Sequence, residues 1–358
     1  MSNICVLPYN IFNKGIFNKT VNKNIPIQGQ IDLTYKCNLK CVHCYIGKRN
    51  KASKEMSFRE VCSVLDQLAA SGCLWLALTG GEAMIRRDFK KIYLYAKSKG
   101  FLITLLSNGT LIDRRMADLL HRYPPFGIEI SIYGVTKKTY ESITRVNGSF
   151  EKCFNGIKLL HKYGIKFKVK TALMTLNKHE FKAIERLADK FKTTFRYDPM
   201  ITSDLDGSIE PCGYRLTPEE IVRYDLSNKK RLQEWKKFYK IYYGQKPADS
   251  VYMCSAGKGM FNIDPSGRLG GCVLSRLPNY NILQGSFREG FFKELPRVYA
   301  SKIKLKNRTN KCYNCSLYVL CGCCPGWNLI EKTAIGTPVA FMCKTAKLRF
   351  KKIRNLMA

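Results

Sequence analysis

The chain is 358 residues long, and 45% of these residues are hydrophobic, enough to bury one large core or two modest ones. Lysine and arginine number 61 against 27 acidic residues, a formal net charge of +34 that fits a solvated basic surface, an acidic peptide partner or nucleic acid. Neither a secretory signal nor an apolar run of about 18 residues is visible, so we expect a cytoplasmic protein without a membrane partner. In such a protein, 16 cysteines indicate metal or redox chemistry rather than a disulfide scaffold.

Short apolar runs alternate with capped amphipathic stretches between residues 28 and 200, a pattern typical of βα units around a parallel sheet. Helices are expected after the capping pairs Ser57 with Glu60 and Asn177 with Glu180, and after Asp113. The sequence therefore predicts an α/β fold with a partial (β/α)6 barrel of the TIM type, whose strands we expect at 30–34, 74–79, 102–107, 128–133, 166–173 and from 194.

The composition changes after Asp198, through a connector and a helix that Thr217, Pro218 and Glu220 predict. From Cys254 onward the chain is rich in Gly, Cys and short loops, so bound metal rather than a large apolar core is expected to hold this region together. We therefore expect an N-terminal extension at 1–27, the barrel at 28–200, a helical linker at 201–245 and a small cysteine-rich iron–sulfur domain at 246–358.

Three cysteines, Cys37, Cys41 and Cys44, lie in the loop after the first expected strand, at the end where barrel enzymes build their sites. Three thiolates around a [4Fe-4S] cluster leave one iron open, and the amine and carboxylate of an amino acid can chelate that iron. A zinc site is the alternative, with His43 as the fourth ligand.

The run Cys-Asn-Leu-Lys-Cys-Val-His-Cys-Tyr at 37–45 resembles the radical S-adenosylmethionine (SAM) superfamily, and the resemblance extends through the barrel. It implies a [4Fe-4S] cluster that binds SAM, and reductive cleavage of SAM to a 5′-deoxyadenosyl radical that abstracts a substrate hydrogen. The same resemblance assigns SAM contacts to the Gly-Gly-Glu motif Gly80, Gly81 and Glu82, to Asn108, to Ser131 facing the ribose and to Arg145 at the carboxylate.

A second constellation of cysteines follows in the C-terminal region and resembles the SPASM extension, which binds two auxiliary iron–sulfur clusters. By the resemblance, the inner cluster is bound by Cys254, Cys272 and Cys324, and the outer cluster by Cys312, Cys315, Cys321 and Cys343. The inner cluster thus has only three evident ligands, and Cys323 and Cys212 are candidates for a fourth. A compact four-thiolate zinc site is the alternative.

Radical SAM proteins with this extension act mostly on ribosomally made peptides and proteins, so the resemblance implies a precursor peptide that is cross-linked or oxidised. Val273 stands where sulfatase-maturing members carry Asp, which disfavours that subclass. About 28 residues precede the first strand, fewer than a leader-binding domain needs, so leader recognition is expected from elsewhere. We further expect Tyr133, Arg196 and Asp198 to face the substrate.

The basic surface would attract an acidic precursor peptide with an affinity that falls as salt is added. An electron donor such as flavodoxin or ferredoxin is the other expected partner. RNA modification is an alternative function that the charge suggests, but no RNA-binding module supports it, and nucleic acid is not an expected partner. A non-catalytic metal-binding protein is the remaining alternative.

Overall fold

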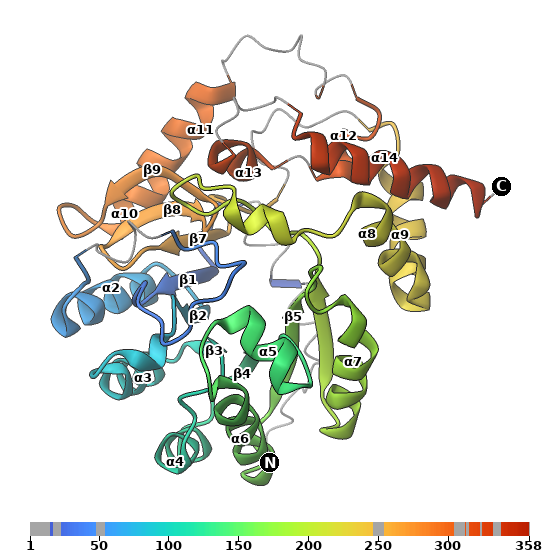
Figure 1. The fold of residues 1–358 in the computed structure, drawn as a ribbon. Helices are drawn as coiled ribbons and strands as arrows, with labels where there is room; N and C mark the ends of the chain where they lie inside the picture. Colours follow the sequence, from blue (N-terminus) through green and yellow to red (C-terminus); the bar gives the residue numbers. More distant parts are fainter. Residues whose placement is uncertain are drawn as a thin grey trace, which may run out of the picture.

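The structure is a computed structural model that describes residues 15–16, 23–47, 54–245, 254–303, 312, 315–322, 324–331 and 338–357. Its backbone is organised around one nine-stranded sheet with the strand order β6-β5-β4-β3-β2-β1-β7-β8-β9 (Figure 1). The first six strands along the chain are all parallel: β1 Gln28–Asp32, β2 Trp75–Thr79, β3 Leu102–Ser107, β4 Gly127–Ser131, β5 Phe167–Ala172 and β6 Thr194–Asp198.

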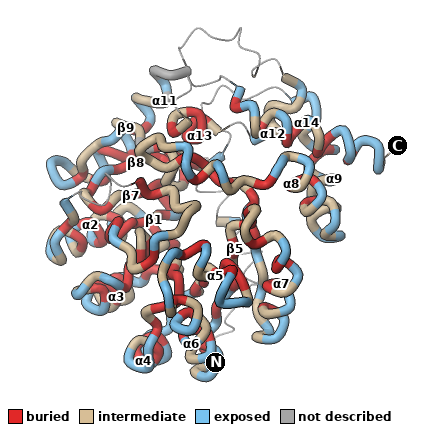
Figure 2. Tube along the Cα trace, viewed as in Figure 1, coloured by how far each residue is buried: buried red, intermediate tan, exposed pale blue. Residues whose placement is uncertain are grey.

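Helices follow these strands and cover the outer face of the curved sheet (Figure 1). Their apolar faces and alternate strand residues such as Ile31, Leu78 and Ile130 form one large core, which appears as the buried parts of the tube in Figure 2. The expected α/β partial barrel is therefore confirmed. The helices and short turns of this region are α2 Phe58–Ala70, η2 Ala83–Ile85, α3 Phe89–Ser98, α4 Arg114–Arg122, α5 Lys137–Thr144, α6 Ser149–Lys162, η3 Lys178–Glu180 and α7 Phe181–Lys190.

Local capping agrees with expectation at α2 and differs at α7. Ser57 Oγ accepts the Glu60 N–H while Glu60 accepts the Ser57 N–H, a complete capping box. The expected pair of Asn177 with Glu180 is wrong: Asn177 Oδ1 accepts the N–H of Met174 at 2.8 Å, and the Glu180 carboxylate accepts the hydroxyl of Thr136. The Glu180 carboxylate therefore accepts hydrogen bonds from the loop after β4 and does not cap its own helix.

The C-terminal region continues the barrel sheet. β7 (Met260–Ile263) pairs in parallel with β1, and β8 (Arg268–Cys272) and β9 (Ser275–Asn281) follow antiparallel. Gly29 makes room for this contact, because a Cβ there would lie 2.2 Å from the Phe261 ring. Phe261, with the aromatic rings that follow β9, joins the core of the barrel. This shared core was not expected for a region that we predicted to be held by metal.

A helical group lies between β6 and β7 in the chain and receives the C-terminal helix. Buried Asp225 of α8 pairs with Arg349 of α14, whose Nη2 lies 2.6 Å from Asp225 Oδ2. Arg231 Nε lies 2.9 Å from Asp225 Oδ1, although not in line for a hydrogen bond. The remaining elements are η4 Glu210–Tyr214, α8 Pro218–Ser227, α9 Lys229–Tyr242, α10 Phe287–Glu289, η5 Gly290–Glu294, α11 Leu295–Ile303, α12 Tyr318–Cys321, α13 Pro325–Ile330 and α14 Ala340–Asn355.

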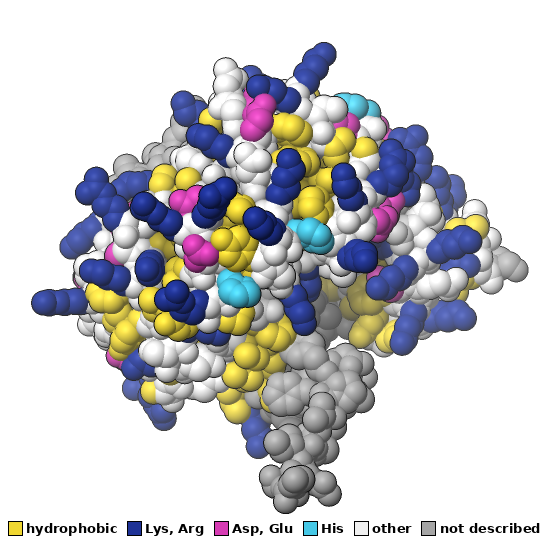
Figure 3. Space-filling model, turned by 90° about the horizontal axis from the view of Figure 1, so that it is seen from below, with side chains coloured by type: hydrophobic (Ala, Val, Ile, Leu, Met, Phe, Trp, Pro, Cys, Tyr) yellow, Lys and Arg dark blue, Asp and Glu magenta, His cyan; other side chains and the backbone are white. Residues whose placement is uncertain are grey.

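The surface is dominated by positive charge. Figure 3 shows Lys and Arg side chains scattered over one whole face, with few Asp and Glu among them. In the part of the chain that the structure describes, no helix is both long and apolar enough to cross a membrane.

Candidate active site

The loop that carries Cys37, Cys41 and Cys44 begins at the carboxyl end of β1 and is fastened on two sides. On the β2 side, the Gly81 N–H donates to the Thr34 carbonyl at 2.7 Å. On the α5 side, the Lys40 N–H donates to the Thr144 carbonyl at 2.9 Å. Main-chain hydrogen bonds therefore hold the loop against both β2 and α5.

Gly80 and Gly81 allow the loop to pass directly over the end of β2. A Cβ on Gly81 would lie 2.3 Å from the Lys36 carbonyl oxygen, and one on Gly80 would lie 2.1 Å from the Thr34 carbonyl oxygen. Gly80 also has φ +138°, a conformation that only glycine adopts readily. The two glycines are thus required by the close approach of two main-chain segments. Their expected contact with SAM stays a prediction.

Glu82 points away from the loop surface and into the barrel wall. Its carboxylate is almost completely buried and accepts the hydroxyl of Ser107 at 3.1 Å and the N–H of Asn108 at 2.8 Å. Burial raises the pKa of Glu82, and the hydrogen bonds from Asn108 and Ser107 oppose that rise. The side chain therefore joins the ends of β2 and β3.

Asn108 connects this pair to the cysteine loop. Its Nδ2 donates to Asn38 Oδ1 at 3.0 Å and approaches Cys37 Sγ at 3.7 Å. Its Oδ1 accepts the hydroxyl of Thr110 at 2.6 Å, and Asn38 Nδ2 donates to that hydroxyl at 2.7 Å. Asn108 thus holds the first cysteine in place, a contact that identifies it as a positioning residue as well as an expected SAM contact.

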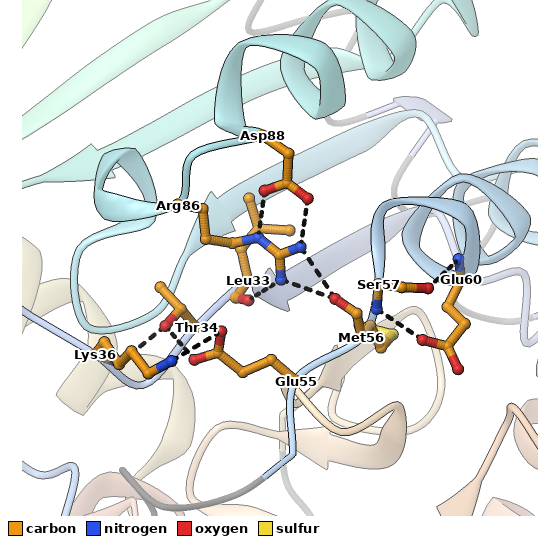
Figure 4. Close-up of polar contacts among 9 residues, drawn as sticks. All are labelled: Leu33, Thr34, Lys36, Glu55, Met56, Ser57, Glu60, Arg86 and Asp88. Carbon is orange, nitrogen blue, oxygen red and sulfur yellow. Dashed lines mark hydrogen bonds and ion pairs between the residues drawn. The ribbon is translucent and has the colours of Figure 1, made fainter.

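Arg86 anchors the base of the loop (Figure 4). Its guanidinium is mostly buried and donates to the main-chain carbonyls of Leu33 at 2.9 Å and Met56 at 3.0 Å. Asp88 holds the other edge through a pair of hydrogen bonds. The role of Arg86 was not predicted from the sequence, because the two carbonyls that it holds in the loop base lie about 30 and 53 residues away and leave no local signal.

The three thiols lie near enough to affect one another. The pKa of Cys37 is raised to about 11, mainly by burial and also by negative charge on Glu82 and Cys44, while a hydrogen bond from Leu39 opposes the rise. Burial also raises the pKa of Cys41, and charge on Cys44 and Cys37 adds to the rise. Positive iron would offset this repulsion, so the three-thiolate donor set fits a [4Fe-4S] cluster.

His43 lies inside the same loop but is arranged differently. Its ring packs edge-on against Tyr133 with 4.7 Å between ring centroids, and its buried Nδ1 has no hydrogen-bond partner. Burial lowers its pKa to about 4. Among the described residues, no three His, Cys, Asp or Glu side chains converge as the ligands of a single metal ion would.

The inner face of the barrel is polar. Most outward-facing positions of β4 and β5 are buried apolar residues, with Thr171 as a polar exception, while the alternate positions carry Glu129, Ser131 and Lys170. Lys170 Nζ lies 3.6 Å from Glu129 Oε2, and burial lowers the pKa of Lys170 although Glu129 opposes that effect. Arg196 of β6 is in register with Lys170, so charged groups of three strands share this face. The alternation of apolar and polar residues that predicts β5 also places Lys170 on the face opposite to the core, a position for which no role was predicted from the sequence.

Ser131 and Arg145 are the two remaining expected SAM contacts of the barrel. Ser131 ends β4, in register with Lys170, and its side chain lies near Tyr133, whose pKa is raised by burial and by charge on Cys41. Arg145 directly follows Thr144, whose carbonyl holds the loop, and its left-handed φ of +57° ends α5. The Arg145 side chain is exposed and available to a carboxylate. Both roles toward SAM stay predictions.

The C-terminal cysteines gather in two groups. The four outer cysteines line one cavity, and charge on Cys343, Cys312 and Cys315 raises the pKa of Cys321 beyond the effect of burial. The inner cysteines also lie near one another. Burial is the main cause of the raised pKa of Cys272, and charge on the neighbouring Cys324 and Cys254 adds to it. Their role as cluster ligands stays a prediction.

Of the two candidates for a fourth ligand of the inner cluster, the structure describes only Cys212. Cys323 lies outside the described residues. Burial raises the pKa of Cys212, and the charged groups that act most on this thiol are Arg215, Glu331 and Asp204 rather than the inner cysteines.

Comparisons with curated proteins give two kinds of relative. The Fe-coproporphyrin III synthase of Methanosarcina barkeri is 31% identical over 44% of this chain and 39% of its own length. The subtilosin biosynthesis protein AlbA of Bacillus subtilis is 29% identical over 49% of this chain. The alignment spans 39% of AlbA. The AdoMet-dependent heme synthase of M. barkeri is 24% identical over 82% of this chain and 89% of its own length.

Among solved structures, SuiB of Streptococcus suis bound to the precursor peptide SuiA shares the fold. The two superpose with a TM-score of 0.72 over 96% of this chain and 83% of SuiB, at 14% identity. The family model of the radical SAM superfamily matches residues 31–191, the segment that carries the cysteine loop and its supports. Residues 31–191, which make up less than half of the chain, are a radical SAM domain.

Proposed function

We propose that this protein cleaves SAM reductively and uses the resulting radical to modify a residue of a ribosomally made peptide, by cross-linking or oxidation. One observation carries the proposal: Cys37, Cys41 and Cys44 lie in a single loop that is fixed against β2, β3 and α5 at the carboxyl end of a polar barrel. When bound, a [4Fe-4S] cluster supplies the electron that breaks the carbon–sulfur bond of SAM.

The protein's own residues position and shield that chemistry. The three thiols hold the cluster, while Asn108, Asn38 and Glu82 fix the loop against the ends of β2 and β3. Ser131 and the exposed guanidinium of Arg145 would orient the ribose and carboxylate of SAM. The curved sheet excludes water from the radical and aligns one carbon–hydrogen bond of the substrate.

A peptide is the substrate that the comparisons favour. AlbA takes its name from subtilosin biosynthesis, and SuiB was solved with a precursor peptide. The formal charge of +34 suits an acidic peptide. We also propose that flavodoxin or ferredoxin donates the electron, that the two C-terminal cysteine groups hold auxiliary clusters, and that the enzyme works in the reducing cytoplasm.

Co-expression tests the peptide assignment. The enzyme is produced with a short peptide encoded beside it, and the peptide mass is measured. A loss of two hydrogens that disappears when Cys37, Cys41 and Cys44 are replaced by Ala supports the proposal. An unchanged peptide mass, with active SAM cleavage in the same preparation, refutes the peptide substrate.

A tetrapyrrole is the second candidate substrate, because the AdoMet-dependent heme synthase aligns over 89% of its own length. Lys170 and Arg196 on the inner face could receive the carboxylates of a porphyrin. Incubating the reduced enzyme with SAM and iron coproporphyrin, followed by mass analysis of the porphyrin, distinguishes the candidates. A loss of carboxyl groups would favour this second function, and an unchanged porphyrin would exclude it.

A further inference from the structure

We propose that β6 and α9 form a docking groove for an extended acidic peptide segment, which pairs with the free edge of β6 as an additional strand. This inference rests on the proposed peptide substrate and names the surface that receives it. The groove has a volume of about 720 Å³ and lies between the two elements. Its walls include Arg196 and Asp198 from β6, and Lys230, Glu234 and Trp235 from α9.

The main chain of β6 is directed toward this groove. β6 is the terminal strand of the sheet and, among the strands that the structure describes, pairs with β5 alone. The Asp198 carbonyl accepts the Leu173 N–H at 2.9 Å and so faces β5. Because main-chain groups alternate along a strand, those of Phe195 and Tyr197 face the groove. The Tyr197 carbonyl accepts a long hydrogen bond of 3.5 Å from Arg231 Nη1, which the N–H of a bound peptide would have to replace. An exposed strand edge of this kind recognises an extended peptide through main-chain hydrogen bonds.

Strand pairing would also deliver side chains to the active site. Side chains alternate between the two faces of an added strand, so every second one would point into the barrel beside Arg196 and Asp198. Asp198 ends β6, and the cysteine loop starts at the end of β1. Since the strands are parallel, both lie at the carboxyl edge of the sheet. A peptide bound here would therefore present residues to the inner face of the barrel, at the edge of the sheet where the cysteine loop begins.

The charge of α9 selects an acidic occupant. This helix carries six cationic side chains against a single acidic one, Glu234. Arg231 is partly committed to Asp225, but Lys230 on the groove wall and Lys229 beside it are exposed. Trp235 and Phe238 supply apolar surface to the same wall. Acidic residues at every second position of an extended peptide would all face the same side, where they can meet Lys230, and the residues between them would face the opposite side.

The experiment measures the binding of labelled peptides to the reconstituted holoenzyme by fluorescence anisotropy. The probe alternates Val and Glu and is long enough to pair along all five residues of β6. Its counterparts alternate Val and Lys, or carry N-methyl groups on alternate amides of the acidic sequence. We expect the acidic probe to bind with an affinity that falls with salt, and both counterparts to bind at least about tenfold more weakly.

Lys230→Glu is the test variant and Lys229→Glu is its matched control, because both lysines are exposed on α9 but Lys229 does not line the groove. We expect Lys230→Glu to weaken binding of the acidic probe about tenfold and Lys229→Glu to change it much less. Equal effects of the two variants, tight binding of the N-methylated probe, or no binding of the acidic probe would overturn the docking groove.

Formation of 5′-deoxyadenosine from SAM is measured in the same preparations. We expect it to be equal in the wild-type and Lys230→Glu proteins, because Lys230 is exposed on α9 and none of the contacts described above joins it to the cysteine loop. If neither protein forms this product, the proposed function fails while the binding data still decide the docking groove.

Discussion

Glu82 accepts the main-chain N–H of Asn108 at 2.8 Å, and this contact joins the end of β2 to the end of β3 beneath the cysteine loop. Asn108 then reaches Asn38 and Cys37. A carboxylate in the wall of the barrel thus determines where the first cysteine lies. The Gly-Gly-Glu motif therefore supports the loop in addition to any contact that it makes with SAM.

The Glu82 carboxylate accepts hydrogen bonds from Ser107, Asn108 and Met84. In Glu82→Gln, the amide NH2 group would face at least one of these donors and could not accept its hydrogen bond. We expect a loss of about 1–3 kcal/mol in the free energy of unfolding, together with less iron at the loop. Thermal unfolding and iron analysis measure both effects. Glu151→Gln, at an exposed surface pair with Lys137, is the control and should change neither. Wild-type behaviour of Glu82→Gln would show that the contact between β2 and β3 does not support the loop.

Gly81→Ala should displace the cysteine loop, because the added methyl group would lie 2.3 Å from the main-chain oxygen of Lys36. Overpacking of this kind typically costs about 1–3 kcal/mol and forces the backbone to move. We expect iron incorporation and 5′-deoxyadenosine formation to fall together. Gly213→Ala is the matched control, since a Cβ there meets no atom within 4 Å. If the two variants incorporate iron equally well, the close approach at Gly81 does not matter for the site.

The pair of Asp225 with Arg349 should be a main support of α14, because both side chains are buried and each is the principal partner of the other. Arg349→Met leaves Asp225 with only the misaligned Arg231, and removing one member of a buried pair costs about 3–5 kcal/mol. The thermal midpoint should fall sharply. Lys344→Met, which breaks the exposed pair with Glu219, should leave the midpoint unchanged. Comparable thermal midpoints for the two variants would show that the pair of Asp225 with Arg349 is not a main support of α14.

The cysteine loop and the two C-terminal cysteine groups together predict an iron content of about 12 per chain, from three clusters of about four irons each. Cys272→Ala should lower this content by about four, because burial and the adjacent Cys324 and Cys254 place its thiol in the inner group. Cys62→Ala should leave the iron content unchanged, since that partly exposed thiol has Asp66 and Lys99 as its charged neighbours. Mostly zinc, with about four irons per chain, would contradict the two auxiliary clusters.

Local signals predicted most of the barrel. Apolar runs and capping residues gave β3 with its observed bounds, and the capping boxes at Ser57 and Thr217 are both present. Asn177 was misread because its side chain satisfies the turn before η3, a choice that sequence spacing does not distinguish from a cap.

Long-range contacts account for what the sequence did not show. Pairing of β7 with β1 joins residues more than 200 positions apart, and neither Met260 nor Gln28 carries a local sign of it. The anchoring contacts of Arg86 and Asn108 are likewise made with partners distant in sequence. Cysteine spacing could group the thiols, but only the fold shows that their loop is held by β2, β3 and α5.

Formation of 5′-deoxyadenosine from SAM, under reducing and anaerobic conditions, tests the central claim most directly. The reconstituted wild-type protein should form it. The variant in which Cys37, Cys41 and Cys44 are all replaced by Ala should form none, while Cys62→Ala remains active. Persistence of 5′-deoxyadenosine in the triple variant, or its absence from a wild-type protein with a full complement of iron, would contradict the assignment of the cysteine loop as the site of SAM cleavage.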